Sequence, residues 1–241
     1  MLIVLGHFLF HTRNVLFPLL LVLICMVWPP TALEAPGSAW LLAVGLLVLA
    51  LGQGLRILTI GLDYIRRGGR NGRIYADKLV TGGLFGLCRN PMYTGNVAMV
   101  VGFLAIAGNP YGMLVGSALG WLAYRAIIAA EESFLAEQFG TSYAAYCRDT
   151  PRWLPAPARL WRIGAGHRFD WATVVLREYG TLLTTIGLVL ALLAIKAARA
   201  GALQAWAPFL AGTALVALGA YGVARFMKKT RRLRPLKTRS G

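Results

Sequence analysis

The first candidate for chemistry is a polar run placed directly before a long apolar stretch. This run, GLFGLCRNPMYTGN, covers residues 83–96. Pro91 suits the first turn of a helix, and Asn90 before it is biased toward extended backbone. A helix N-terminus exposes backbone amides, and glycine allows close backbone approach, so the run predicts a cradle for an anionic group. The alternative is a plain membrane-entry loop, with Arg89 reaching the surface and Tyr93 in an aromatic belt.

A second polar run, EESFLAEQFGTSYAAY, covers residues 131–146 and begins where an apolar stretch ends. Gly140 is a natural helix end, and Thr141 or Ser142 could cap a second short helix. Two carboxylates at the end of a membrane helix oppose its dipole, so Glu131 and Glu132 favour a cationic partner or a bound amino group. A helix that simply continues would remove that penalty.

Arg125 is the third candidate, because an ionisable side chain inside an apolar run is costly. Glu132 is seven residues further along the same helix face, about 10 Å away. Trp121, one turn earlier, is placed to stack on the guanidinium. If the neighbouring apolar runs form a hairpin, Arg89, Asn96 and Glu132 would line one polar pocket. The alternative is that Arg125 only extends its charge to the aqueous surface.

Other kinds of site find no support in the residue pattern. Three histidines and three cysteines are scattered, without zinc spacing or a disulfide framework, and no Walker loop is present. We therefore predict no metal site. The formal net charge is +16, but the basic residues lie mostly between or after apolar runs. The positive-inside rule explains that placement, so we predict the membrane, and not nucleic acid, as partner.

These side chains must be positioned by membrane helices. Of the 241 residues, 57% are hydrophobic and only 14% are charged, which is typical of a multi-pass membrane protein. The pattern predicts an all-α transmembrane bundle of about six spans, with a short cytoplasmic helical segment after the fourth. The predicted spans are 15–28, 39–60, 91–107, 113–130, 171–194 and 205–226.

Basic residues set the expected orientation. They crowd the links after the second and fourth predicted spans and the C-terminal tail. We assign Arg56 to the link after the second span, and Lys196 and Arg199 are the exception after the fifth. Both termini then lie in the cytoplasm. The N-terminus lacks a basic start, so it predicts an uncleaved membrane helix, and we expect a bacterial inner-membrane protein.

Together, the two polar runs resemble the isoprenylcysteine carboxyl methyltransferase family, which is related to the membrane phospholipid methyltransferases. That family carries a G-x-[YF]-x-x-x-R-[HN]-P-x-Y-x-G run, an apolar hairpin and an E-E-x-x-L-x-x-x-F-G-x-x-Y-x-x-Y run. The second run ends near an aromatic residue followed by Ile or Leu and Pro. The matching positions here are Gly83, Phe85, Arg89, Asn90, Pro91, Tyr93, Gly95, Glu131, Glu132, Leu135, Phe139, Gly140, Tyr143, Tyr146, Trp153, Leu154 and Pro155.

The resemblance implies a membrane enzyme that transfers a methyl group from S-adenosylmethionine to a lipid or lipid-linked acceptor. It implies a methyltransferase core at 78–157, a membrane region at 1–77 and a C-terminal region at 158–241. An anionic oxygen, carboxylate or phosphate, is the acceptor atom that we expect. The implied site residues are Arg89, Arg125 and Glu132 for catalysis, and Gly83, Asn90, Pro91, Tyr93, Gly95, Glu131, Glu132, Tyr143 and Tyr146 for the donor.

One departure concerns Asn90, because the commoner family residue before the proline is His. Asn hydrogen-bonds similarly but cannot take a proton at neutral pH, so this position does not serve as a base. Two other functions compete with the methyltransferase interpretation. A non-enzymatic transporter or assembly protein would rely on Arg125, the last two spans and the basic tail. A membrane reductase of related architecture would use a nicotinamide cofactor. Binding of the methyl donor separates the methyltransferase from both.

Overall fold

The computed structural model describes residues 1–62, 76, 78–154 and 169–233. All the regular secondary structure in these residues is helical, and they contain no strand, so the all-α prediction is confirmed. A short 3-10 helix, η1 (Gly83–Gly86), precedes the third of the long helices. These are α1 (Leu2–Val27), α2 (Ser38–Leu62), α3 (Pro91–Ala107), α4 (Pro110–Asp149), α5 (Trp171–Arg199) and α6 (Leu203–Lys229).

Within the described ranges, five helices are long and apolar enough to cross a membrane. The sixth, α3, is apolar but has 17 residues, about 26 Å at 1.5 Å per residue. Its length is close to the apolar thickness of a bilayer, so the multi-pass bundle is confirmed. The first helix begins at Leu2 and not near residue 15, because the preceding residues are apolar enough to extend it.

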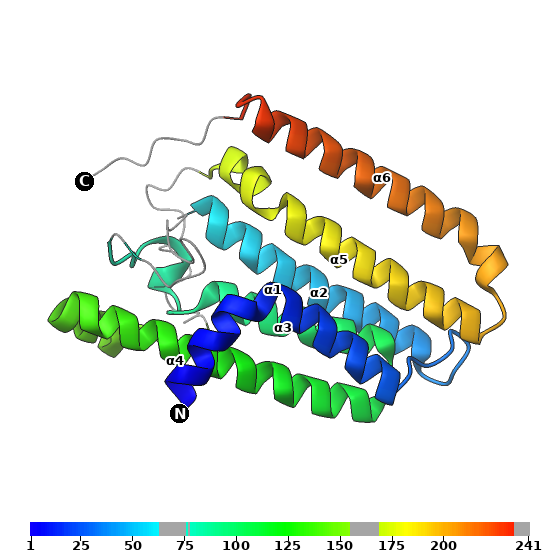
Figure 1. Ribbon diagram of the computed structural model, residues 1–241, viewed down its shortest axis with the longest axis horizontal. Coiled ribbons are helices and arrows are strands. Elements are labelled where there is room, and N and C mark those ends of the chain that lie inside the picture. Colours follow the sequence, from blue (N-terminus) through cyan, green and yellow to red (C-terminus); the bar gives the residue numbers. More distant parts are fainter. Residues whose placement is uncertain (63–75, 77, 155–168, 234–241) are drawn as a thin grey trace.

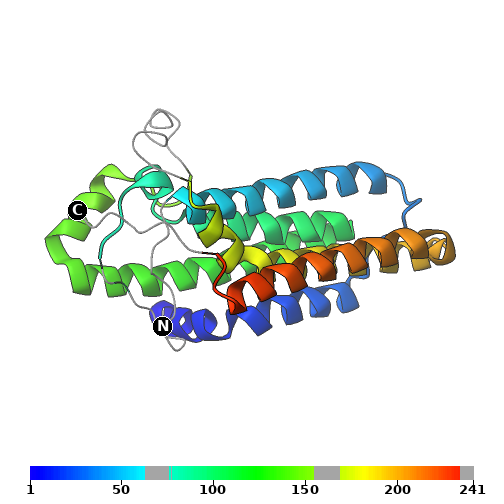
Figure 2. The same ribbon diagram turned by 90° about the horizontal axis from the view of Figure 1, so that it is seen from above.

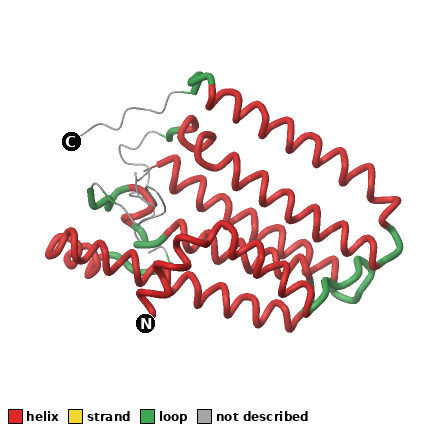
Figure 3. Tube along the Cα trace, in the orientation of Figure 1, coloured by secondary structure: helices red, strands yellow, loops and turns green. Residues whose placement is uncertain are grey.

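The helices run side by side along the length of the molecule (Figure 1). The turns that join α1 to α2, α3 to α4 and α5 to α6 lie at one end, and the view from above agrees (Figure 2). The opposite end holds the N-terminus, η1 and the last described residues after α6. The tube view shows that end as short helix and loop (Figure 3). Both polar runs lie there. Pro155 and most basic residues of the two long links lie outside the described residues.

Glycines allow α2 and α3 to pack very closely. A Cβ on Gly52 or Gly95 would lie 2.7 Å from the carbonyl oxygen of the other residue. Gly45 and Gly102 repeat this contact seven residues away along each helix. Small residues at such an interface let two membrane helices gain dispersion contact. Gly95, which we predicted to hold the donor, therefore serves helix packing, and it is buried against α2.

Gly140 interrupts α4, as the sequence predicts. Its φ of 48° and ψ of −120° are non-helical, and the helix resumes directly after it. The part of α4 before Gly140 is about 45 Å long, so α4 extends past the rest of the bundle before it bends (Figure 1). This extension carries the second polar run back toward η1 and the start of α3.

Two basic residues assigned to links from the sequence lie instead inside helices. Arg56 belongs to α2 and pairs with a carboxylate of α5. Lys196 belongs to α5 and is fully buried at the opposite end of the bundle, where its Nζ donates to Thr31 Oγ1 at 2.9 Å. The sequence did not predict these two contacts, because a basic residue near the end of an apolar run is ordinarily assigned to the following loop.

Candidate functional site

Residues 151–153, just after α4, join the two polar runs. Their three consecutive carbonyl groups each accept a hydrogen bond from the first run. The donors are the backbone amide of Arg89, Nδ2 of Asn90 and Oγ1 of Thr94, at 2.8, 3.1 and 2.9 Å. This pairing fixes the chain after α4 against the N-terminal turn of α3.

Glu132 lies at the centre of this junction. Its carboxylate is 2.6 Å from Nη2 of Arg152 and 3.3 Å from Nη1 of Arg89, and Nδ2 of Asn90 donates to it at 3.3 Å. Burial lowers the pKa of Arg89, but the neighbouring Glu132 and Cys147 outweigh it and raise that pKa above its ordinary value. Arg89 therefore stays protonated.

The structure brings Arg89 and Glu132 together, as the hairpin prediction requires. Asn90 is a further partner of Glu132, whereas the third predicted residue, Asn96, accepts a hydrogen bond from Arg56 of α2.

A cavity of about 730 Å³ opens beside this junction. Its charged end is lined by Arg89, Asn90, Tyr93 and Glu131, and the carboxylate-bearing Glu131 is only 4% exposed. Glu132 is absent from the lining. Its other end is lined by apolar side chains of α1, α3 and α5, among them Phe17, Leu21, Ile24, Val100, Phe103 and Leu188. One cavity thus joins a charged pocket to a space suited to hydrocarbon.

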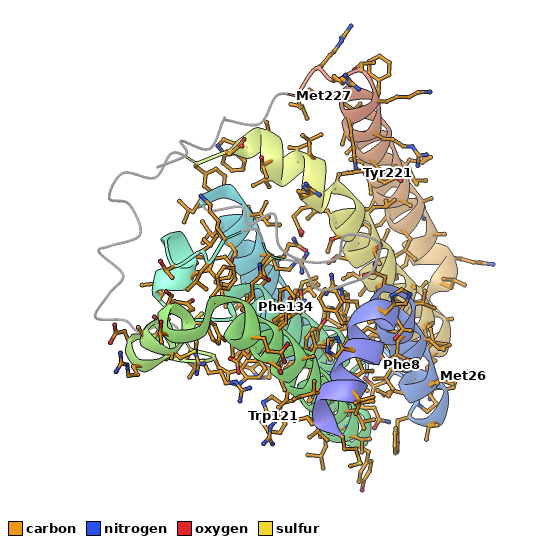
Figure 4. All side chains as sticks on the ribbon, turned by 60° about the vertical axis from the view of Figure 1, so that its left-hand side comes forward. Phe8, Met26, Trp121, Phe134, Tyr221 and Met227 are labelled. Carbon is orange, nitrogen blue, oxygen red and sulfur yellow. The ribbon has the colours of Figure 1, made fainter. Side chains whose placement is uncertain are left out.

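Arg125 lies away from this cavity. Its side chain is exposed on α4, with the guanidinium carbon 5.4 Å from the ring of Trp121. Figure 4 shows Trp121 on the outer side of that helix. The predicted stacking is present, but the predicted pocket does not include Arg125.

The two tyrosines of the second run stabilise the junction by packing and by one hydrogen bond to η1. Tyr143 and Tyr146 pack with Leu135 and Ala76 in a small core. The hydroxyl of Tyr146 donates to the carbonyl of Phe85 in η1 at 2.7 Å. Both side chains are buried and absent from the cavity lining, so their contacts hold the second run against η1.

The two remaining predicted donor residues shape the backbone before α3. Gly83 begins η1 with a φ of 52°, a left-handed conformation that favours glycine. Pro91 is the first residue of α3 and is buried.

Sequence reasoning missed Glu178 of α5, which lines the cavity and is 1% exposed. Its partners are Arg56 and Gln53 of α2. Two signals could have found them. Glu178 is a carboxylate inside a predicted span. Gln53 and Arg56 are three residues apart in another span, so they share one helix face.

A family model matches the part of the chain that contains the first polar run and the beginning of the second. Residues 40–142 match the family model described as phospholipid methyltransferase. Protein-S-isoprenylcysteine O-methyltransferase B of Arabidopsis thaliana is 30% identical over 124 residues, which are 48% of this chain and 60% of that protein. The mouse protein-S-isoprenylcysteine O-methyltransferase is 30% identical over 136 residues, 53% of this chain and 44% of that protein.

A bacterial relative also matches. Cobalt-zinc-cadmium resistance protein CzcN of Cupriavidus metallidurans is 35% identical over 79 residues, 33% of this chain and 36% of that protein. The matches thus span less than two thirds of these relatives, and no solved structure matches significantly. The comparisons confirm, over residues 40–142, the resemblance to the family of isoprenylcysteine carboxyl methyltransferases and phospholipid methyltransferases.

Proposed function

We propose that this chain is an integral membrane methyltransferase that uses S-adenosylmethionine and modifies an anionic oxygen of a lipid or lipid-linked acceptor. The observation that carries the proposal is the single cavity between a charged pocket and an apolar space. A polar donor and a lipid-borne acceptor need such a shared site, because the methyl group must pass directly between them.

The charged end of the cavity fits the donor. Glu131 offers a buried carboxylate for an amino group or a sulfonium, and Tyr93 offers a ring face. The first turn of α3 has no side-chain cap hydrogen bond, so its backbone amides suit the donor carboxylate. Bound S-adenosylmethionine would supply an electrophilic methyl group.

Arg89 is the residue that we assign to the acceptor. Its Nη1 faces Glu132 and Cys147, whereas its buried Nε has no hydrogen-bond partner among the described residues. A protonated guanidinium that lines the cavity suits a carboxylate or phosphate oxygen. Such an oxygen is already nucleophilic, so no general base is required, and Asn90 in place of a histidine is no obstacle. The remaining task is to orient the reactants and exclude water.

The acceptor would enter from the lipid. The apolar part of the cavity is lined by α1 and α5, yet α1 packs mainly on α4. We therefore place the lateral route between α1 and α5. The proposed orientation puts both termini in the cytoplasm of a bacterial inner membrane. It rests on Lys228 and Lys229 of α6 and on Arg231 and Arg232 directly after it, at the same end as the polar runs.

The test is incubation of the purified protein with methyl-labelled S-adenosylmethionine and a total lipid extract, followed by identification of the labelled lipid. We expect Arg89→Lys to lower methyl transfer by about 100-fold, because a misplaced acceptor loses most of the orientation effect. Arg125→Lys, on the outer side of α4, is the matched control and should stay within about twofold. A wild-type protein that binds no donor would instead favour a non-enzymatic transporter or assembly protein.

A further inference from the structure

A second polar cluster lies on the cavity wall between its two ends. It consists of Gln53 and Arg56 of α2, Asn96 of α3 and Glu178 of α5, and we call these four residues the intramembrane cluster. Nη2 of Arg56 lies 2.5 Å from Oε1 of Glu178, and Nε of Arg56 donates to Oε2 at 3.1 Å. Nη1 of Arg56 donates to Oδ1 of Asn96, and Nε2 of Gln53 donates to Oε2 of Glu178 at 2.8 Å.

The cluster occupies a definite depth in the cavity. Arg56, Asn96 and Glu178 all line it. Asn96 follows Asn90 along α3 by six residues, about 9 Å of helix axis. The next lining residues of α3, from Met99 to Leu104, are apolar. The order along the cavity is therefore the charged end, the intramembrane cluster and then the hydrocarbon space.

Helix packing alone does not account for a charged pair at this position. Glu178 is 1% exposed, and taking two charges out of water usually costs as much as their attraction returns. Apolar residues would join α2 to α5 equally well. Ionisable residues at membrane depth typically line the path of a substrate.

The charge of the cluster limits what it can bind. One guanidinium and one carboxylate cancel, so a further full charge gains little from Arg56 and Glu178. Arg56 has five N–H donors, and three are used by Asn96 and Glu178. An uncharged group that accepts from the free N–H groups and donates to the carboxylate fits this arrangement.

We infer that the intramembrane cluster binds an uncharged hydrogen-bonding group of the methyl acceptor, such as an amide, placed between its methylated end and its hydrocarbon chain. The inference rests on the proposed function and narrows the acceptor to amphiphiles of this kind, as opposed to simple fatty acids. Glu178 lies outside residues 40–142, so this selectivity would come from a helix that the family match does not cover.

Two acceptors of equal chain length test the inference: N-dodecanoyl-glycylglycine, which carries amides, and octadecanoic acid, which does not. Their affinities for the protein in lipid nanodiscs are measured with S-adenosylhomocysteine present, so that no turnover is needed. We expect the wild type to prefer the amide probe by about tenfold, the effect of one or two net hydrogen bonds. Equal affinities would overturn the inference.

The decisive variant is Arg56→Met combined with Glu178→Leu, which removes both charges together and leaves neither unpaired. We expect it to lose the preference while its thermal midpoint and its affinity for S-adenosylmethionine stay unchanged. A preference that survives would show a purely structural cluster. Should this variant not fold, Asn96→Ala replaces it and should reduce the preference at least twofold.

The matched control is Lys196→Met, which removes a buried basic side chain of α5 that lies away from the cavity. It should keep the tenfold preference, and a loss there would count against the cluster. Failure of the wild type to bind S-adenosylmethionine would refute the proposed function. The ratio of the affinities for the two probes would still test the intramembrane cluster. Failure of the proposed function and failure of the inference can therefore be told apart.

Discussion

Glu131 and Glu132 are adjacent in the chain but have different surroundings. Glu131 is buried and lines the cavity, whereas Glu132 is enclosed by Arg89, Arg152 and Asn90. Adjacent positions on a helix differ by about 100°, so the carboxylate of Glu131 faces the cavity and that of Glu132 faces Arg89 and Arg152. From the sequence, both carboxylates were candidates for binding the methyl donor.

Exchange of each carboxylate for its amide separates the two roles. We expect Glu131→Gln to weaken S-adenosylmethionine binding about tenfold or more with little change in thermal midpoint. Glu132→Gln should lower the free energy of unfolding by about 1–3 kcal/mol, because two guanidinium groups lose their charged partner. Equilibrium binding and thermal unfolding measure the two effects. If Glu132→Gln instead weakened S-adenosylmethionine binding and Glu131→Gln lowered the stability, Glu132 would be the residue that binds the donor.

The two cysteines near the junction should differ in reactivity. Cys88 is fully buried, and burial raises its pKa to about 11. At pH 8 only about 0.1% of such a thiol is the reactive thiolate, and labelling should rise only as the pH approaches 11. Cys147 is half-buried beside Arg89, with Sγ 3.0 Å from Nη1. We expect maleimide to modify Cys147 first and bound donor to slow that reaction, which mass spectrometry can follow; equal labelling of both would contradict this.

The meeting of Arg89 and Glu132 was predictable, because the two runs flank a predicted hairpin and carry recognisable helix-start and helix-end signals. The pairing of two residues within separate predicted spans was not. Glu178 and Arg56 meet across 122 residues of sequence separation. No local periodicity encodes such a pairing, which depends on how α2 and α5 are rotated about their axes.

At the scale of elements, the contact between α2 and α3 decides where the first polar run sits. Gly52 and Gly95 let the two backbones touch, and this close approach also brings Arg56 beside α3. The glycines of the run had suggested a ligand cradle. The sequence could not separate the two uses, because glycine is needed wherever anything approaches the backbone.

Alanine substitutions distinguish a packing glycine from a free one. We expect Gly95→Ala to destabilise the protein by about 1–3 kcal/mol, because its Cβ would overlap the carbonyl of Gly52. Gly54→Ala, on the partner helix α2 but with no atom within 4 Å of the added Cβ, should be neutral or stabilising by up to about 1 kcal/mol. Unfolding in a denaturant titration compares them. Equal stability of the two variants would refute the glycine contact.

At the scale of the whole molecule, the helix order and number followed from apolar runs, but their relation to the cavity did not. The division into 1–77, 78–157 and 158–241 stays a prediction. The cavity nevertheless draws its lining from all three regions, since α1, α3 and α5 each contribute. The last helix, α6, contributes Lys228 to the lining, but none of its residues is buried and it packs mainly on α5.

Removal of α6 tests how far the bundle depends on it. We expect a chain that ends at Gly201 to stay monodisperse in detergent and to bind S-adenosylmethionine within about threefold of the full chain, because no core residue is lost. Size-exclusion chromatography and equilibrium binding provide the measurements. Aggregation, or a lost affinity for the donor, would instead make α6 part of the working core.

In the proposed function the two ends of the cavity would meet different solvents, and this would determine how turnover scales. The donor would reach Arg89 and Glu131 from water, so its supply would follow its bulk concentration. An acceptor that enters beside α1 and α5 is dissolved in the bilayer, so its supply follows its mole fraction among lipids. Added inert phospholipid would then slow methylation by surface dilution, even when the total amounts of protein, donor and acceptor in the tube are constant.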